Sequence, residues 1–185
     1  MKNIFKYVSY ILCISAILIL LKPVFFYTKS FIMQNKLRYE WNQTMENKQI
    51  NPYDNSIYPI GKINIDKLNL SSIITSGDLE QSLEVSIAHI PNTSKPGQLG
   101  NIGLAGHRDT FFKKLKDIKI NDIIEIEYLE GISEYRVNDI KIIQPDETNY
   151  LYDKNKETLT MITCYPFEYL GNAPLRYMVK AKLLN

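Results

Sequence analysis

The chain is short of cysteine, of histidine and of any excess charge. Its 185 residues include two Cys and two His, and the formal net charge at pH 7 is +2. A balance so near neutral argues against a nucleic-acid partner, because phosphate backbones are bound by surplus Lys and Arg. Cys13 lies in an apolar N-terminal stretch, which leaves one thiol in the rest of the chain. That thiol has no partner for an internal disulfide, and the same scarcity argues against a structural zinc site.

Long apolar runs are confined to the N-terminus. The stretch Tyr7–Leu21 is uncharged and mostly apolar, and its continuation to Tyr27 is long enough to cross a bilayer if Lys22 extends its amine to the interface. A cleaved signal peptide is the alternative, but residues 20–24 offer no small-x-small cleavage site. We therefore predict a cytoplasmic tail and a transmembrane anchor over residues 1–27, with the remainder outside the membrane.

The remainder divides into a polar segment and a folded domain. Residues 28–56 are polar with isolated aromatic residues, which predicts a stalk or linker that is helical up to about Met45. Residues 57–185 are long enough to bury a core of their own. The overall composition, 45% hydrophobic and 23% charged, is that of a globular protein.

Most of this domain is predicted to form short strands. Seven segments alternate in polarity or are rich in β-branched residues, namely 61–68, 70–75, 102–105, 123–128, 135–143, 158–164 and 175–183. Two short helices are predicted over 79–87 and 111–115, with Asp78 and Asp109 as their N-caps. Many short strands with few helices indicate an all-β barrel or sandwich, and closure into a barrel would leave no exposed strand edge.

The candidate nucleophile is Cys164, near the end of a predicted strand. Pro166 follows it and cannot donate to a strand ladder, so the pairing stops there. The returning strand carries Arg176 near its start, which predicts a thiol and a guanidinium at the same end of one hairpin. The alternative is an inert buried cysteine, since free Cys commonly packs as a small hydrophobe.

A histidine at a second strand end favours the reactive thiol. His107 follows Gly106 directly after the predicted strand 102–105. A nucleophilic thiol needs a base or an imidazolium partner, and acyl transfer needs a donor where the carbonyl oxygen becomes negative. The other histidine, His89, is predicted to be structural. Asp109 is predicted to cap a helix rather than to orient His107 as a triad acid.

Three ordered blocks of this domain resemble those of the sortase family. They are Leu104–Phe112 (LAGHRDTFF), Leu159–Pro166 (LTMITCYP) and Ala173–Tyr177 (APLRY). The resemblance runs from about residue 58 to the C-terminus. It implies an all-β fold, a closed eight-stranded β-barrel with short helices behind an N-terminal transmembrane helix. It also implies a single-pass protein of a Gram-positive cell membrane, with its catalytic domain on the extracellular face.

The activity that the resemblance implies is that of a cysteine transpeptidase. Cys164 as thiolate attacks the Thr carbonyl of an LPxTG-like sorting motif, His107 protonates the departing Gly amine, and Arg176 donates to the carbonyl oxygen. The implied partners are secreted proteins with a C-terminal sorting signal, an amine of a cell-wall precursor of the lipid II type, and membrane lipid. Neither a metal nor a cofactor is expected. The positions that match the family's substrate groove are Ala105, Ile162 and Thr163.

The resemblance also favours one subclass. Residues 51–53 (Asn-Pro-Tyr) lack the acid of a class C lid motif, and residues 165–174 are too few for the class B insertion. Class D is preferred, with class A or E next. Two other functions stay open at this point. One is a non-catalytic, membrane-tethered barrel that binds cell-wall or pilus components, and the other is a plain cysteine peptidase.

Overall fold

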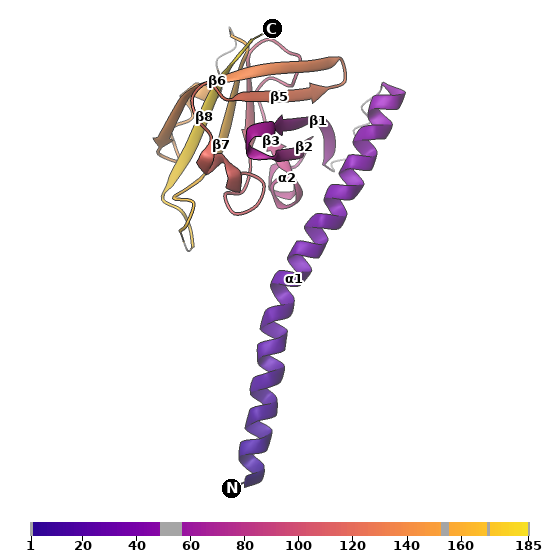
Figure 1. Cartoon of the computed structure of the whole chain (residues 1–185), viewed down its shortest axis with the longest axis vertical. Coiled ribbons are helices and arrows are strands. Elements are labelled where there is room, and N and C mark those ends of the chain that lie inside the picture. The colour runs from indigo at the N-terminus through magenta and orange to yellow at the C-terminus, as the bar shows by residue number, and fades with distance from the viewer. Residues whose placement is uncertain (1, 49–56, 153–155, 170, 185) are drawn as a thin grey trace.

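The computed structural model shows a long helix beside a small β-barrel (Figure 1). It describes residues 2–48, 57–152, 156–169 and 171–184. Helix α1 covers Lys2–Asn47, and the barrel begins at Tyr58. The anchor and the helical stalk predicted from the sequence therefore lie in one continuous helix. Most of the predicted linker before the barrel lies outside the described residues.

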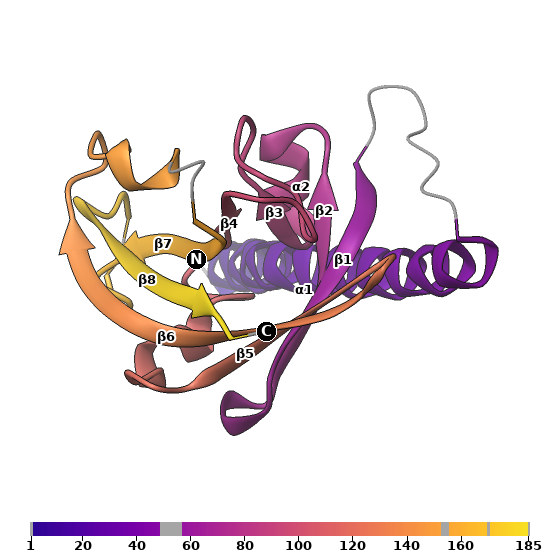
Figure 2. The same cartoon turned by 90° about the horizontal axis from the view of Figure 1, so that it is seen from above.

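Eight strands and four short helices follow α1 in the part of the chain that is described. The strands are β1 (Tyr58–Ile65), β2 (Leu70–Ser76), β3 (Ile87–His89), β4 (Asn101–Ala105), β5 (Ile123–Tyr128), β6 (Gly131–Ile143), β7 (Thr158–Tyr165) and β8 (Leu175–Leu183). The helices are η1 (Asp66–Leu68), α2 (Leu79–Val85), η2 (Lys113–Asp117) and η3 (Asn149–Leu151). The strands close into a barrel in the order β1-β2-β3-β4-β7-β8-β6-β5, seen from above in Figure 2. The predicted eight-stranded closed barrel is confirmed.

Aliphatic side chains that alternate along the strands fill the barrel. Ile63 and Ile65 of β1, Ile124 and Ile126 of β5, and Val179 of β8 are fully buried in one cluster. Burying a side chain of this kind contributes about 1.5–3 kcal/mol, so these residues supply much of the energy that holds the strand ends in place. The rigid barrel is what positions the loops at its edges.

Seven of the eight strands overlap predicted segments and β3 was not predicted, whereas one of the two helix caps is confirmed and the other needs correction. Asp78 is the N-cap of α2, where its carboxylate accepts a hydrogen bond from Gln81 N at 2.8 Å. Asp109 is not an N-cap. Helix η2 begins only at Lys113, and Phe112 precedes it without a side-chain capping bond. The turn after β4 is closed by backbone hydrogen bonds instead, so it does not need the carboxylate.

Helix α1 packs against the barrel through its C-terminal part. Leu37 and Trp41 are almost fully buried against Ile73 of β2 and Val85 of α2. The segment is therefore not a free stalk. The N-terminal part of α1, by contrast, exposes large apolar side chains between Phe5 and Leu21.

The transmembrane helix predicted within residues 1–27 is not confirmed. In the part of the chain that the structure describes, no helix combines the length and the apolar character needed to cross a membrane.

Candidate active site

The ends of three neighbouring strands meet at one edge of the barrel. β4 pairs parallel with β7, and β7 pairs antiparallel with β8. The C-terminal ends of β4 and β7 and the start of β8 must therefore lie at the same edge. The first of these ends leads into His107, the second carries Cys164, and the third carries Arg176. The barrel thus brings together three residues that are far apart in the sequence.

Cys164 faces the outside of the barrel at this edge. It is paired directly with Arg176 across the β7–β8 ladder. Leu159 and Met161 of the same strand point into the core, so the alternate residues Ile162 and Cys164 point outward. The Cys164 side chain is partly exposed and makes no disulfide, which leaves it open to a ligand.

Two of the three predicted groove residues share this outward face. Ala105 and Ile162 are register partners in the β4–β7 ladder, and both are partly exposed. Thr163 lies on the opposite face, where it is only 3% exposed. Its hydroxyl donates to the Gly106 carbonyl at 2.7 Å. The structure therefore groups Ala105 and Ile162 with Cys164 and places Thr163 behind them.

His107 is exposed at the start of a tight turn. The ladder continues one residue past β4, where Gly106 N donates to the Ile162 carbonyl at 3.3 Å. The His107 carbonyl then accepts from Phe112 N at 2.9 Å and from Thr110 N at 3.4 Å. A Cβ atom on Gly106 would lie 2.8 Å from the Phe112 ring, so this position needs glycine. The backbone of His107 is thereby fixed beside β7.

The guanidinium of Arg176 is held by the backbone before its own strand. Nη1 donates to the Ala173 carbonyl at 3.2 Å and to the Leu175 carbonyl at 2.9 Å. These two bonds restrict the rotamers of a long side chain, and the group stays partly exposed. The remaining N–H donors of the guanidinium can serve a bound ligand.

His89 is engaged elsewhere. Its Nε2 lies 3.0 Å from the Ser94 carbonyl and 3.1 Å from the Thr93 hydroxyl. Since a carbonyl only accepts, Nε2 carries the proton. Burial lowers the pKa of His89 below its ordinary value of 6.5, which keeps the ring neutral at pH 7. His89 therefore stabilises the connection between β3 and β4 through these two contacts.

Sequence reasoning missed two residues that support this edge. Asn101 donates to the Leu151 carbonyl at 2.9 Å and accepts from the hydroxyls of Thr158 and Thr160, both at 2.8 Å. It holds η3 against β4 and β7. Arg108, next to His107, donates to three carbonyls of the β7–β8 connection. An amide side chain directly before a predicted strand was the only signal for the first, and nothing in the sequence named the partners of either.

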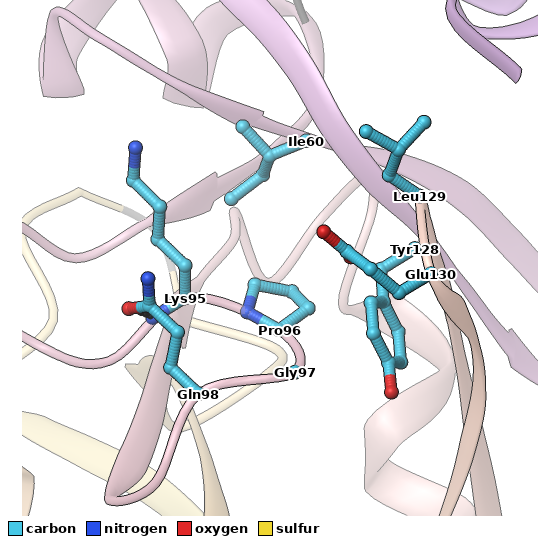
Figure 3. Close-up of a pocket in the computed structure, with 8 residues that line it drawn as sticks. All are labelled: Ile60, Lys95, Pro96, Gly97, Gln98, Tyr128, Leu129 and Glu130. Carbon is cyan, nitrogen blue, oxygen red and sulfur yellow. Dashed lines mark hydrogen bonds between the residues drawn. The ribbon is translucent and has the colours of Figure 1, made fainter. Parts of the chain in front are cut away.

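A separate pocket of about 300 Å³ lies away from these residues. Figure 3 shows Pro96 between Ile60, Lys95 and Tyr128, with the Glu130 carboxylate reaching over it. The pocket lies between the β3–β4 connection and the turn between β5 and β6, and it contains none of the predicted site residues. Among the described residues, no group of three or more His, Cys, Asp or Glu could hold a metal ion.

Known proteins resemble this chain in sequence and in structure. The Sortase domain family model matches residues 63–184. Sortase D of Bacillus subtilis is 34% identical over 123 residues, which are 66% of this chain and 62% of that protein. Sortase A of Bacillus anthracis is 27% identical over 127 residues, which are 66% of this chain and 56% of that protein. The chain thus spans less than two thirds of these relatives.

A solved structure is also similar to this chain. A Sortase D5 transpeptidase of Clostridium perfringens superposes with a TM-score of 0.68 and 29% identity, over 85% of this chain and 98% of that one. The family match covers more than half of the chain and includes all three strand ends described above. The chain belongs to the sortase family.

Proposed function

We propose that the chain is a class D sortase, a cysteine transpeptidase that acts on LPxTG-like sorting motifs. The observation that carries the proposal is the pairing of Cys164 with Arg176 on neighbouring strands, beside the strand end that leads into His107. The likeness to Sortase D and to the Sortase D5 transpeptidase supports the subclass.

The proposed reaction has two steps with one covalent intermediate. The Cys164 sulfur attacks the Thr carbonyl carbon, the Thr–Gly amide bond breaks, and the departing Gly amine takes a proton from His107. An incoming amine then attacks the thioester and gives a proton back to His107, while the sulfur leaves as thiolate. The result is a new amide, and the enzyme is unchanged.

We assign a role to each neighbour of Cys164, and the geometry of the site supports these roles. Arg176 donates to the substrate carbonyl oxygen as negative charge develops on it, and a donor so placed changes the rate by about 10²–10³. The outward face that holds Ala105 and Ile162 next to Cys164 forms the floor on which the motif lies. Thr163 supports this floor from behind through its bond to the Gly106 carbonyl.

The proposed partners are those that the family resemblance implies. The acyl donors are secreted proteins with a C-terminal sorting signal, and the acceptor is an amine of a cell-wall precursor of the lipid II type. We place the barrel at the outer face of the cell membrane, attached through the N-terminal part of α1. The exposed apolar side chains of that part, from Phe5 to Leu21, support membrane attachment.

Peptide cleavage by the full chain in detergent tests the proposal. The wild type is incubated with a fluorogenic sorting peptide, with and without an added oligoglycine amine, and the products are identified by mass spectrometry. We expect cleavage between Thr and Gly, an acyl adduct on Cys164, and diversion of the product to the amide when the amine is present. Cys164→Ala removes the activity, whereas Cys13→Ser, which changes the other thiol, retains it.

The other outcomes separate the alternatives. Cleavage that the amine does not divert would identify a cysteine peptidase. Binding of the sorting peptide without any Cys164-dependent cleavage would identify a non-catalytic binding module. Either result would refute the proposed transpeptidase.

A further inference from the structure

The side chain of Arg108 crosses from the turn after β4 to the connection between β7 and β8. Its Nη1 donates to the Pro166 carbonyl at 3.2 Å. Its Nη2 donates to the carbonyls of Tyr169 and Gly171, at 2.6 and 2.9 Å. The guanidinium carbon also lies 5.8 Å from the centre of the Tyr169 ring. One side chain thus contacts three backbone positions of the connection that follows Cys164.

This set of contacts requires the shape of arginine. The planar guanidinium holds its donors in fixed directions, so it can bridge several carbonyls that lie in different directions at once. A lysine ammonium carries the same charge but has three donors around a single point. The carbonyls of a loop have no fixed ladder partner of their own, so a donor that collects three of them fixes the course of the loop.

The same connection orients Arg176. The last carbonyls before and at the start of β8, those of Ala173 and Leu175, accept from the Arg176 guanidinium. The described residues of the connection, 166–169 and 171–174, are therefore held at one end by Arg108 and hold Arg176 at the other. A shift of the loop would move the acceptors on which Arg176 depends.

We propose that Arg108 is a positioning residue for the active site: by holding the β7–β8 connection against the turn that bears His107, it sets the orientation of the Arg176 guanidinium beside Cys164. The inference rests on the proposed function, because it assigns Arg108 its effect through Arg176. Among the described residues, the hydrogen bonds of the Arg108 guanidinium go to carbonyls of the connection and not to Cys164 or Arg176.

An ion pair between η2, which follows the turn that bears Arg108, and the same connection provides a control. Lys116 of η2 lies 3.9 Å from Glu168, and their side chains are 44% and 91% exposed. Exposed pairs of this kind contribute little, because water screens the charges and the long side chains lose freedom. Removing Lys116 therefore changes the local charge as much as removing Arg108 does, without releasing the loop.

Amide hydrogen exchange of the full chain in detergent tests the loop directly. In Arg108→Lys and Arg108→Gln we expect exchange in residues 167–169 and 171–176 to accelerate by about tenfold or more, since opening of the loop no longer breaks three bonds. Exchange in the core strands β1 and β5 and the circular dichroism spectrum stay as in the wild type. In Lys116→Ala the loop exchanges as in the wild type. Unchanged exchange in both Arg108 variants would overturn the inference.

Kinetics of sorting-peptide cleavage test the route through Arg176. We expect Arg108→Lys to lower kcat by about tenfold with a smaller change in KM, because the lost orientation affects the developing charge more than the bound motif. In an Arg176→Lys background, Arg108→Lys causes little further loss, since the two residues act through one group. Losses that simply multiply would overturn the inference, as would full activity in Arg108→Lys.

The two experiments distinguish failure of the proposed function from failure of this inference. A wild-type chain that cleaves no sorting peptide would refute the proposed function. The exchange experiment would still decide whether Arg108 holds the connection, because it needs no turnover.

Discussion

At the scale of single residues, two neighbours on β7 have opposite surroundings. Strand side chains alternate between faces, so Cys164 is partly exposed outside the barrel while Thr163 is buried behind it. The Thr163 hydroxyl joins β7 to the end of β4 through the Gly106 carbonyl. A role for Thr163 in binding substrate stays a prediction, and its position favours a role in holding the strand ends together.

Substitution of Thr163 separates these roles. Thr163→Val keeps the shape but leaves the Gly106 carbonyl without its donor, which we expect to lower the free energy of unfolding by about 1–3 kcal/mol. Thr163→Ser keeps the hydroxyl and serves as the matched control. Urea denaturation measures the stability, and peptide cleavage measures KM. A rise in KM without loss of stability in Thr163→Val would instead favour direct substrate contact.

Arg176 is predicted to be irreplaceable by lysine. Two of its bonds go to the Ala173 and Leu175 carbonyls, and a third donor has to reach the substrate. One ammonium cannot serve all three directions, so we expect Arg176→Lys to lower kcat/KM by about 10²–10³ while the fold is kept. Steady-state cleavage and a thermal melt check this. Arg136→Lys, on the exposed part of β6, is the control and should be neutral.

His89 gives the fold a dependence on pH. Burial lowers its pKa in the folded chain, so below the ordinary value of 6.5 the unfolded chain binds more protons than the folded one. Stability is therefore lost as the pH falls below 6.5 toward the folded pKa, and it is fully present above 6.5. We expect the free energy of unfolding to fall as the pH drops below 6.5 in the wild type and to fall less in His89→Gln. Equal slopes in both proteins would contradict this.

The residues that sequence reasoning found and missed differ in what marks them. His107, Cys164 and Arg176 each lie near a strand end, within two residues of a glycine or proline, and their side-chain chemistry is distinctive. Arg108 and Asn101 act on backbone carbonyls of loops, and every residue type has a carbonyl. Their partners emerge only when the chain is folded, so no pattern of residue types could name them.

At the scale of elements, strong periodicity decided what could be predicted. β5 and β8 have the predicted bounds, because their alternation runs over the whole strand. β3 has only three residues and was not predicted as a strand, and its first residue, Ile87, was assigned to the helix at 79–87. Its pairing is tertiary, with Ile74 of β2 opposite Ile87 and Leu104 of β4 opposite His89, so local sequence carries no sign of it.

The contact between α1 and the barrel can be followed by fluorescence. Trp41 is the single tryptophan of the chain and is 2% exposed, so its emission reports this contact alone. We expect Leu37→Ala to release the helix and shift the emission to the red, because the cavity removes about 2–5 kcal/mol from a small cluster. The barrel keeps its circular dichroism spectrum, since its core is a separate cluster.

The control for this prediction lies on the same helix. Tyr39 is 66% exposed, so Tyr39→Ala should leave the emission unchanged. A blue emission in Leu37→Ala equal to that of the wild type would show that Leu37 does not hold the helix.

At the scale of the whole molecule, barrel closure is what assembles the site. The order β4-β7-β8 places three blocks side by side that are far apart in the sequence. β6 pairs with the other edge of β8. The family resemblance, which rests on these three blocks, predicted the barrel. Their convergence on one edge depends on parallel β4–β7 pairing, which requires a crossover and is not visible in the strand patterns.

The edge of the barrel that holds the site faces the N-terminal end of α1. In Figure 1 the connection between β7 and β8, drawn in yellow, is the part of the barrel that extends furthest toward the N-terminal end of the helix. With that end attached to a membrane as proposed, the site edge lies on the side of the lipid. A lipid-linked amine would approach the thioester from that side.

Membrane attachment gives the last prediction. The side chains of Ile11, Ile14 and Leu18 are 66%, 58% and 58% exposed, an arrangement that costs free energy in water and gains it in lipid. We expect the full chain to sediment with lipid vesicles and the double variant Ile14→Lys/Leu18→Lys to stay largely in the supernatant, because each charge near the bilayer centre costs about 2.5–3.5 kcal/mol. Asn35→Lys adds a charge to an exposed part of α1 outside this stretch and should sediment like the wild type. Equal sedimentation of the double variant would locate the membrane contact elsewhere in the chain.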